Sequence, residues 1–236
     1  GDGTLLELAQ ALRDTEETLG VIPAGTGNDF RRAIGVPRDP AAALDVALEG
    51  RVRRVDVGLL DDGRAFLNVA GTGFDVDVIR HTEKVRRIAT GALAYYLGIV
   101  MSLLTYRGVT LTITADGRTI RKKALLVAVA NGRCYAGGLM VAPNADASDG
   151  LFNVVVIGSL PNWRILFELP KMQRGEPEKI PGTETFLCSE LTIDCDRKLT
   201  FNLDGETYGQ TPMTMRIRPA ALRVFGGPAG EDVANA

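Results

Sequence analysis

Two glycine-rich turns near the start of the chain constrain its fold more than any other feature. The first reads Gly-Asp-Gly-Thr at residues 1–4, and the second reads Pro-Ala-Gly-Thr-Gly-Asn-Asp-Phe at residues 23–30. Glycine lets the backbone approach a ligand closely and direct several N–H groups at one anion. A following helix adds its positive N-terminal end. Two such turns, about one βα unit apart and with shared chemistry, predict a phosphate site.

The segments around these turns alternate between helix and strand patterns, as in a layered α/β domain. Residues 4–19 carry apolar side chains at a helical spacing, which predicts a helix, and residues 21–22 read as a short buried strand. Asp39 followed by Pro40 predicts the start of another helix that stops at Gly50. Because a strand ordinarily precedes a turn of this kind, we expect the front portion of this domain to be missing from the chain.

The rest of the chain is rich in strand patterns. Asp-Gly turn sequences at residues 61–63 and 116–117 separate pairs of apolar runs, which predicts two hairpins. Further strands are expected at residues 151–157, 190–194, 198–203, 213–217 and 222–225, with helices near 78–106 and 163–169. We therefore expect an α/β remainder over residues 1–57, a β-rich domain over 58–217, and over 218–236 a closing strand that returns to the first domain, followed by a frayed tail.

One segment of the β-rich part is almost wholly apolar. This run, residues 92–104, has 13 residues and is shorter than the ~20 that span a bilayer. It is either a buried helix packed on the sheet or a helix that lines an acyl-chain cleft. The basic residues Arg80, Lys84, Arg86 and Arg87 precede it; such a run is either a solvated face or a contact for anionic lipid headgroups.

Composition excludes several kinds of chemistry. His81 is the single histidine, which argues against Ser-His-Asp, Cys-His and multi-histidine metal sites. The cysteines, Cys134, Cys188 and Cys195, have no metal-ligand spacing and are odd in number, which favours a reducing cytoplasm over a disulfide framework. With 27 basic and 29 acidic residues, the chain offers no electrostatic surface for nucleic acid. The groups that remain available for catalysis are carboxylates, backbone amides and a hard metal ion.

Taken together, the motifs resemble the diacylglycerol kinase catalytic-domain family, which includes bacterial diacylglycerol kinases, related bacterial lipid kinases, and the sphingosine and ceramide kinases. The two glycine turns and Asn-Leu-Asp-Gly-Glu at residues 202–206 carry the resemblance. Supporting motifs lie at residues 55–58, 68–75 and 137–150. The matches recur in family order from Gly1 to Phe225 and so cover nearly the whole chain.

This resemblance implies an N-terminal α/β domain related to the phosphofructokinase and NAD-kinase folds, and a C-terminal β-sandwich-like domain that takes the lipid substrate. It implies an ATP- and magnesium-dependent kinase that phosphorylates a lipid hydroxyl, with diacylglycerol converted to phosphatidic acid as the expected reaction. It also implies a cytoplasmic enzyme in peripheral contact with a membrane, with a homodimer left open. The alternatives are a sphingoid acceptor, a soluble acceptor as in NAD kinase, or a catalytically silent lipid- or nucleotide-binding module.

The resemblance also assigns residues to the nucleotide and to catalysis. The nucleotide residues are Gly1, Asp2, Gly3, Thr4, Glu7, Gly25, Thr26, Gly27 and Asn28. Asp204 is implied as the general base that takes the hydroxyl proton, supported by Glu206; if the flanking chain is extended, both carboxylates face one side. Taken alone, Asp204-Gly205 would read as an ordinary hairpin turn. A rival base is Asp2, by similarity to the sphingosine-kinase branch.

Further carboxylates are implied in metal and substrate binding. Asp2, Asp29 and Asp56 match a family network of aspartates and waters linked to the active-site magnesium. A separate structural magnesium site is implied at Asp149, with main-chain oxygens around Asp146 and Leu151; the alternative for Asp149 is turn capping. Asp75 matches a substrate-side acidic position, and Asp77 is a second candidate; either could be only a helix cap.

Overall fold

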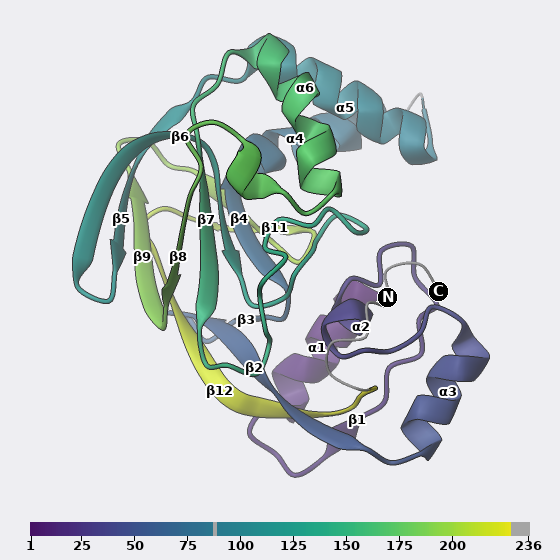
Figure 1. The fold of residues 1–236 in the computed structure, drawn as a ribbon. Helices are drawn as coiled ribbons and strands as arrows, with labels where there is room; N and C mark the ends of the chain where they lie inside the picture. The colour runs from purple at the N-terminus through teal and green to yellow at the C-terminus, as the bar shows by residue number, and fades with distance from the viewer. Residues whose placement is uncertain (87–88, 228–236) are drawn as a thin grey trace.

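The structure, a computed structural model, describes residues 1–86 and 89–227 (Figure 1). The predicted frayed tail therefore lies mostly outside the described residues, as does Arg87 of the basic run. In chain order the elements are α1 (Asp2–Leu12), β1 (Thr18–Leu19), α2 (Phe30–Ala33), α3 (Pro40–Leu48), β2 (Val52–Leu60), β3 (Ala65–Phe66), β4 (Val69–Gly73), α4 (Phe74–Val85), α5 (Gly91–Thr105), β5 (Val109–Ala115), β6 (Arg118–Ala130), β7 (Phe152–Gly158), α6 (Asn162–Gln173), the 3₁₀ helix η1 (Pro177–Lys179), β8 (Glu184–Cys188), β9 (Glu190–Cys195), β10 (Thr200–Leu203), β11 (Glu206–Gln210) and β12 (Met213–Phe225).

The strands form one curled sheet with the order β11-β10-β4-β6-β5-β9-β12-β2-β3, with β7 paired to β6 and β8. All these neighbours are antiparallel. Strand alternation divides the packing: in β6, Val127 and Val129 face the core inside the curl, whereas Leu126 and Ala128 face the helices. Figure 1 shows α4, α5 and α6 gathered over the upper part of this sheet, away from the chain ends.

Helices α1, α2 and α3 form a second body at the lower end of the sheet (Figure 1). Their core is shared with β2 and β12, since Val55 and Leu222 pack there with Leu5 and Phe30. The other ends of the same two strands belong to the core inside the curl. The strands expected at residues 213–217 and 222–225 are thus one strand, interrupted by a register shift where it pairs with β2. The α/β plus β fold class is confirmed.

The expected helix over residues 4–19 is too long. The helix ends at Leu12, and Asp14 adopts a left-handed φ of 60° and donates its N–H to Ala221 O at 2.7 Å. The chain then pairs residues 18–19 in parallel with β12, so the expected strand at residues 21–22 is shifted towards the N-terminus. Tertiary pairing with β12 has overridden the local helical pattern.

The apolar run at residues 92–104 forms α5, and only part of this helix is buried. Ala94, Ile99 and Leu103 face the molecule, whereas Leu93 and Leu104 are exposed. The helix is therefore buried on the side that packs against the sheet, and its other side is open to its surroundings. In the part of the chain that the structure describes, no helix is both long and apolar enough to cross a bilayer.

Candidate active site

The two glycine turns predicted to hold phosphate are in direct contact. A Cβ atom placed on Gly25 would lie 2.6 Å from the Cα of Gly1. Asn28, with a left-handed φ of 49°, closes the second turn: Gly25 N–H donates to Asn28 Oδ1 at 3.0 Å, and Asn28 Nδ2 donates to Gly25 O at 2.5 Å. The backbones meet this closely only because neither glycine carries a side chain.

The first turn is also the first turn of helix α1. Gly1 is its N-cap, and the N–H groups of the first helical residues have no partner within the helix. They are therefore available to an anion, which the helix dipole also favours. Thr4 and Glu7 lie on the exposed side of α1, and Thr26 is exposed at the tip of the second turn.

Gly25→Ala is expected to weaken nucleotide binding by at least tenfold, because the added Cβ atom would meet the Gly1 backbone at 2.6 Å and Asn28 Oδ1 at 2.9 Å. The turns would have to move apart, and geometry lost at a phosphate site is costly. The measurement is the Kd of a non-hydrolysable ATP analogue. Gly20→Ala is the matched control, since its Cβ atom would make only ordinary contacts of 3.7 Å or more. Unchanged affinity in Gly25→Ala would contradict the assignment.

Three carboxylates converge beside the turns. Asp2, Asp29 and Asp204 all line a cavity of about 700 Å³, together with Thr26 and Gly27. Burial, and then the charge of Asp2, raise the pKa of Asp29, although a hydrogen bond from Gly137 N at 2.8 Å and the Arg32 guanidinium act in the opposite direction. Carboxylates that share one cavity and one of which has a raised pKa suit a proton acceptor, or a cation that takes its other ligands from elsewhere.

Asp204 lies in the tight turn between β10 and β11. Asp204 and Gly205 both have positive φ, of 48° and 99°, as a two-residue hairpin turn of this kind requires. The carboxylate accepts three backbone hydrogen bonds, from Leu67 N at 2.6 Å and from Asn68 N and Val69 N at 2.9 Å each. Burial nevertheless raises its pKa to about 6, against the three amides and with a contribution from Asp2.

Glu206 also lies near the glycine turns, but not on the same side of an extended strand as Asp204. Because Asp204 is in a left-handed turn, the two residues do not alternate along an extended chain, as the sequence suggested. Glu206 is exposed in β11, and a Cβ atom on Gly3 would lie 3.6 Å from its Oε1. Its Oε2 accepts a hydrogen bond from Arg64 Nη2 at 2.8 Å. The structure thus brings Glu206 to the first glycine turn.

Arg64 is a site residue that sequence reasoning missed. Besides holding Glu206, its guanidinium lies 4.3 Å from the centre of the Tyr208 ring. The Tyr208 hydroxyl donates to Asp62 Oδ2 at 2.5 Å, and the backbone N–H of Arg64 donates to Asp62 Oδ1 at 3.0 Å. The sequence around Asp62 indicated only a hairpin turn, and no local pattern pairs it with β11, which lies far away in the chain.

The cavity extends from the carboxylates into an apolar chamber beneath the helices. Its apolar lining includes Phe74 and Val78 of α4, Ile99 of α5, and Ile165, Leu169 and Met172 of α6. Asp75 lies at the boundary between the two regions and is 8% exposed, and among the described residues its Oδ1 has no hydrogen-bond partner. Asn202 Nδ2 donates to its Oδ2 at 3.4 Å, and burial raises the pKa of Asp75 to about 6. Asp77 does not line this cavity.

Asp75→Asn is expected to increase the free energy of unfolding at pH 8 by about 1–3 kcal/mol. The folded-state pKa of about 6 lies above the ordinary value of 3.8, so ionisation of this carboxyl costs stability as the pH rises through about 6. The stability gained by the variant should vanish near pH 4. Urea titrations at both pH values, with Asp77→Asn as the neighbouring control, measure the difference. Lower stability of the variant at pH 8 would contradict this account.

The remaining predicted metal residues form a second group. Both carboxylate oxygens of Asp56 accept backbone hydrogen bonds, from Gly150 N at 2.7 Å and Ala220 N at 2.8 Å. Burial, and then the charges of Asp146 and Asp56, raise the pKa of Asp149. Asp149 Oδ1 caps the turn by accepting from Leu151 N at 2.9 Å. Among the described residues, no three His, Cys, Asp or Glu side chains are arranged to hold a metal ion.

Known proteins resemble this chain over most of its length. Residues 1–60 match the family described as "Diacylglycerol kinase catalytic domain", and residues 68–226 match "YegS C-terminal NAD kinase beta sandwich-like domain". A "Probable lipid kinase YegS-like" of Klebsiella pneumoniae is 32% identical over 225 residues, which cover 94% of this chain and 74% of that protein. A "Diacylglycerol kinase" of Mycobacterium tuberculosis is 31% identical over 231 residues, or 95% and 74% of the two chains.

A solved structure agrees with these relatives. The crystal structure of a diacylglycerol kinase from Bacillus anthracis str. Sterne has a TM-score of 0.71 and 25% sequence identity to this chain, with 97% of this chain and 75% of that chain covered. The resemblance drawn from the glycine turns and the Asp-Gly-Glu motif is confirmed. The chain belongs to the diacylglycerol kinase catalytic-domain family of lipid kinases, with a C-terminal domain of the YegS type.

Proposed function

We propose that this protein is an ATP- and magnesium-dependent kinase that phosphorylates diacylglycerol to phosphatidic acid. One observation carries the proposal: a single cavity joins the glycine turns and their carboxylates to an apolar chamber of the kind that takes an acyl chain. A kinase for a lipid alcohol needs a polar region and an apolar region in the same cavity, because the nucleotide is highly charged and the acceptor is mostly hydrocarbon. Membership of the lipid kinase family supports the same activity.

In this proposal the chain holds the two substrates in line. The N–H groups at the start of α1 and of residues 26–28 in the second turn bind the nucleotide phosphates. The acceptor hydroxyl lies near Asp75 and transfers its proton to Asp204, while its oxygen forms the bond to the γ-phosphorus and the bond to ADP breaks. Asp204 has one acceptor position left after its three backbone hydrogen bonds, which is enough for one proton.

The donor chemistry fits magnesium at two places, since this ion prefers carboxylate and other oxygen ligands. Asp2 and Asp29 would hold it beside the phosphates, where it would supply neutralisation of the charge on the transferred group. Asp149, with main-chain oxygens near Asp146 and Leu151, would hold a structural ion. The charge of Asp2 raises the pKa of Asp29, and the charge of Asp146 raises the pKa of Asp149. These effects support both sites, because a cation beside the carboxylates would relieve the repulsion.

The outer faces of α5 and α6 support contact with a membrane surface. These helices lie side by side above the sheet (Figure 1). Leu104 is 80%, Phe167 71% and Trp163 67% exposed. An exposed apolar surface that includes tryptophan is typical of a membrane interface. The inner faces of the same helices line the apolar chamber. If their outer faces contact a lipid bilayer, an acyl chain can pass from the bilayer into the chamber.

Replacing Trp163 and Phe167 together with serine is expected to reduce binding to lipid vesicles by tenfold or more, because two exposed apolar side chains no longer enter the bilayer. Flotation with phosphatidylcholine vesicles measures the binding. Activity on a short-chain, water-soluble diacylglycerol should be retained. Leu48→Ser, at a residue of α3 that is 75% exposed at the other end of the molecule, is the control. Equal flotation of all variants would exclude this face as the membrane contact.

The experiment that tests the reaction offers the full-length protein several acceptors. With γ-labelled ATP and magnesium, detergent micelles carry diacylglycerol, sphingosine, ceramide or no lipid, and NAD is supplied as a soluble acceptor. Label in phosphatidic acid is the expected result. Label in another lipid or in NAD would show that the protein is a kinase with a different acceptor. Measurable ATP binding with no labelled product would favour a catalytically silent binding module.

A further inference from the structure

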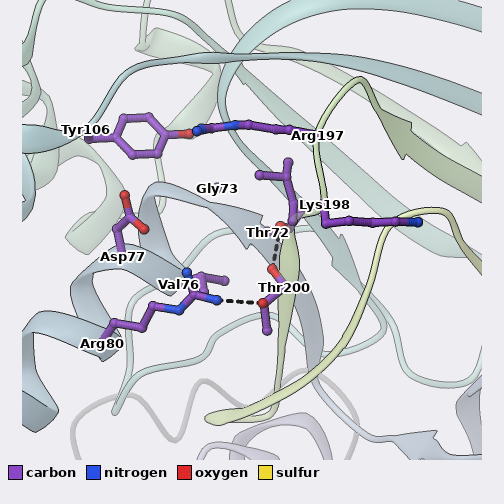
Figure 2. A pocket seen from close by; sticks show the side chains of 10 residues that line it. Thr72, Gly73, Val76, Asp77, Arg80, Tyr106, Arg197, Lys198 and Thr200 are labelled. Carbon is purple, nitrogen blue, oxygen red and sulfur yellow. Dashed lines mark hydrogen bonds between the residues drawn. The ribbon is translucent and has the colours of Figure 1, made fainter.

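A second, smaller cavity lies next to the acceptor cavity and is lined by positive charge. Its volume is about 110 Å³, and it lies between α4, β4, β10 and the loop that precedes β10 (Figure 2). Cavities that hold drug-sized ligands are about 300–1,000 Å³, so this one is suited to a small group. Its lining includes Gly73, Asp77, Arg80, Tyr106, Arg197 and Thr200.

Two guanidinium groups reach this cavity from different elements. Figure 2 shows Arg80 extending from α4 and Arg197 extending from the loop before β10. Within the described ranges, no carboxylate lies within ion-pairing distance of either arginine. Lys198 does not add to the site, because its Nζ donates to Thr211 O at 2.8 Å and points away.

The neutral groups around the arginines are set to donate or are already satisfied. Arg80 Nη2 donates to Thr200 Oγ1 at 2.6 Å, which leaves the hydroxyl proton of Thr200 free for another acceptor. The Tyr106 hydroxyl donates to Leu125 O at 2.6 Å. Burial, and then Asp75 and Asp77, raise the pKa of Tyr106, so it brings no negative charge. Two fixed cations therefore face one carboxylate, that of Asp77, across the cavity.

The small cavity is placed beside the reacting end of the acceptor. Helix α4 contributes Asp75 to the large cavity and Asp77 and Arg80 to the small one. Strand β10 contributes Asn202 to the large cavity and Thr200 to the small one. Residues two apart on a strand point to the same face, roughly 7 Å from one another. An anion here would thus lie beside the polar end of a bound lipid.

We propose that the cavity between Arg80, Arg197 and Thr200 is a binding site for a phosphate group. The planar guanidinium matches the geometry of phosphate oxygens, and two of them with one hydroxyl can contact a single phosphate. The group would come either from free inorganic phosphate or from the headgroup of a phospholipid held in the large cavity. Binding of inorganic phosphate does not depend on the proposed kinase activity, so the site can fail or hold independently of that function.

The test follows backbone amide resonances of the full-length protein during titration with inorganic phosphate. The amides of Gly73 and Thr200 should shift in a saturable manner, separately from any shift at Gly25 and Gly27, where phosphate would also bind. Arg197→Gln should weaken the response at Gly73 and Thr200 about tenfold and leave the response at the glycine turns unchanged. Arg216→Gln is the control, because this exposed arginine pairs with Glu190 on another part of the sheet.

A second titration distinguishes the two sources of phosphate. A short-chain phosphatidylglycerol that moves the Gly73 and Thr200 amides at lower concentration than inorganic phosphate would identify a lipid headgroup, and the reverse order would identify free phosphate. Short-chain diacylglycerol, which has no phosphate, should not produce the response that depends on Arg197. Shifts confined to the glycine turns, or shifts at Thr200 that are unchanged in Arg197→Gln, would overturn the proposal.

Discussion

Replacing Asp204 with asparagine is expected to lower kcat by about 10²–10⁴-fold, the usual contribution of a general base. Asparagine keeps the size of the side chain but cannot accept the hydroxyl proton. The wild-type kcat/KM should rise about tenfold per pH unit below pH 6 and then level off, because burial sets the pKa of Asp204 to about 6 and only the ionised form accepts a proton. Initial rates from pH 5 to pH 9 measure both effects.

Asp2→Asn is the comparison that decides between the two candidate bases. Asp2 accepts one long hydrogen bond, from Phe30 N at 3.4 Å, whereas Asp204 accepts three from backbone amides. Thermal melting of both variants must accompany the kinetics, since asparagine cannot replace all three acceptor contacts of Asp204. If folded Asp204→Asn retains near-normal turnover while Asp2→Asn does not, the base is Asp2. Loss of the pH dependence below 6 in Asp204→Asn alone would support Asp204.

Asp56→Ala is expected to lower the free energy of unfolding by about 4 kcal/mol, among the largest effects of a single substitution. Asp56 is 2% exposed, and its two oxygens accept from Gly150 N and Ala220 N. Without them, two backbone N–H groups lose their partners in a buried place, at about 1–3 kcal/mol each. Denaturant unfolding of the purified variant measures the change. Asp45→Ala, on the exposed side of α3, should change stability by less than about 0.5 kcal/mol.

Magnesium separates this structural role from the metal role that the sequence suggested. If Asp56 holds backbone amides, the loss of stability should be the same with magnesium and with EDTA. If Asp56 acts only through an ion, the variant and the wild type should be equally stable in EDTA and differ only when magnesium is present. The second pattern would contradict the structural role.

The sequence predicted those parts of the fold that local chemistry determines. The Asp-Gly hairpins formed where the turn residues require, and Asp39 caps α3 by accepting from Ala42 N at 2.9 Å. The sequence-based prediction failed where residues far away in the chain determine the local structure. Residues 18–19 form a strand because β12 lies beside them. Strand β11 was missed because its residues are mostly exposed, so it has no apolar alternation.

The same division applies to the candidate site. The glycine turns were recognisable because each motif carries its own geometry, and their direct contact agrees with the predicted phosphate site. The partners of the carboxylates were not recognisable, since Asp204 is held by amides of residues 67–69 and Glu206 by Arg64, more than a hundred residues away in the chain. No spacing rule relates such residues, so only the folded sheet reveals these contacts.

The paired strands β2 and β12 have a consequence for how this enzyme family can diversify. Strand β2 runs from Val52 to Leu60 and contributes to two hydrophobic cores. A recombination between related genes at residue 57 would therefore join two halves of one strand pair, β2 with β12, that both cores share. Exchange of whole modules is therefore disfavoured. Point substitutions on α4, α5 and α6, by contrast, change the lining of the cavity without altering that strand pair.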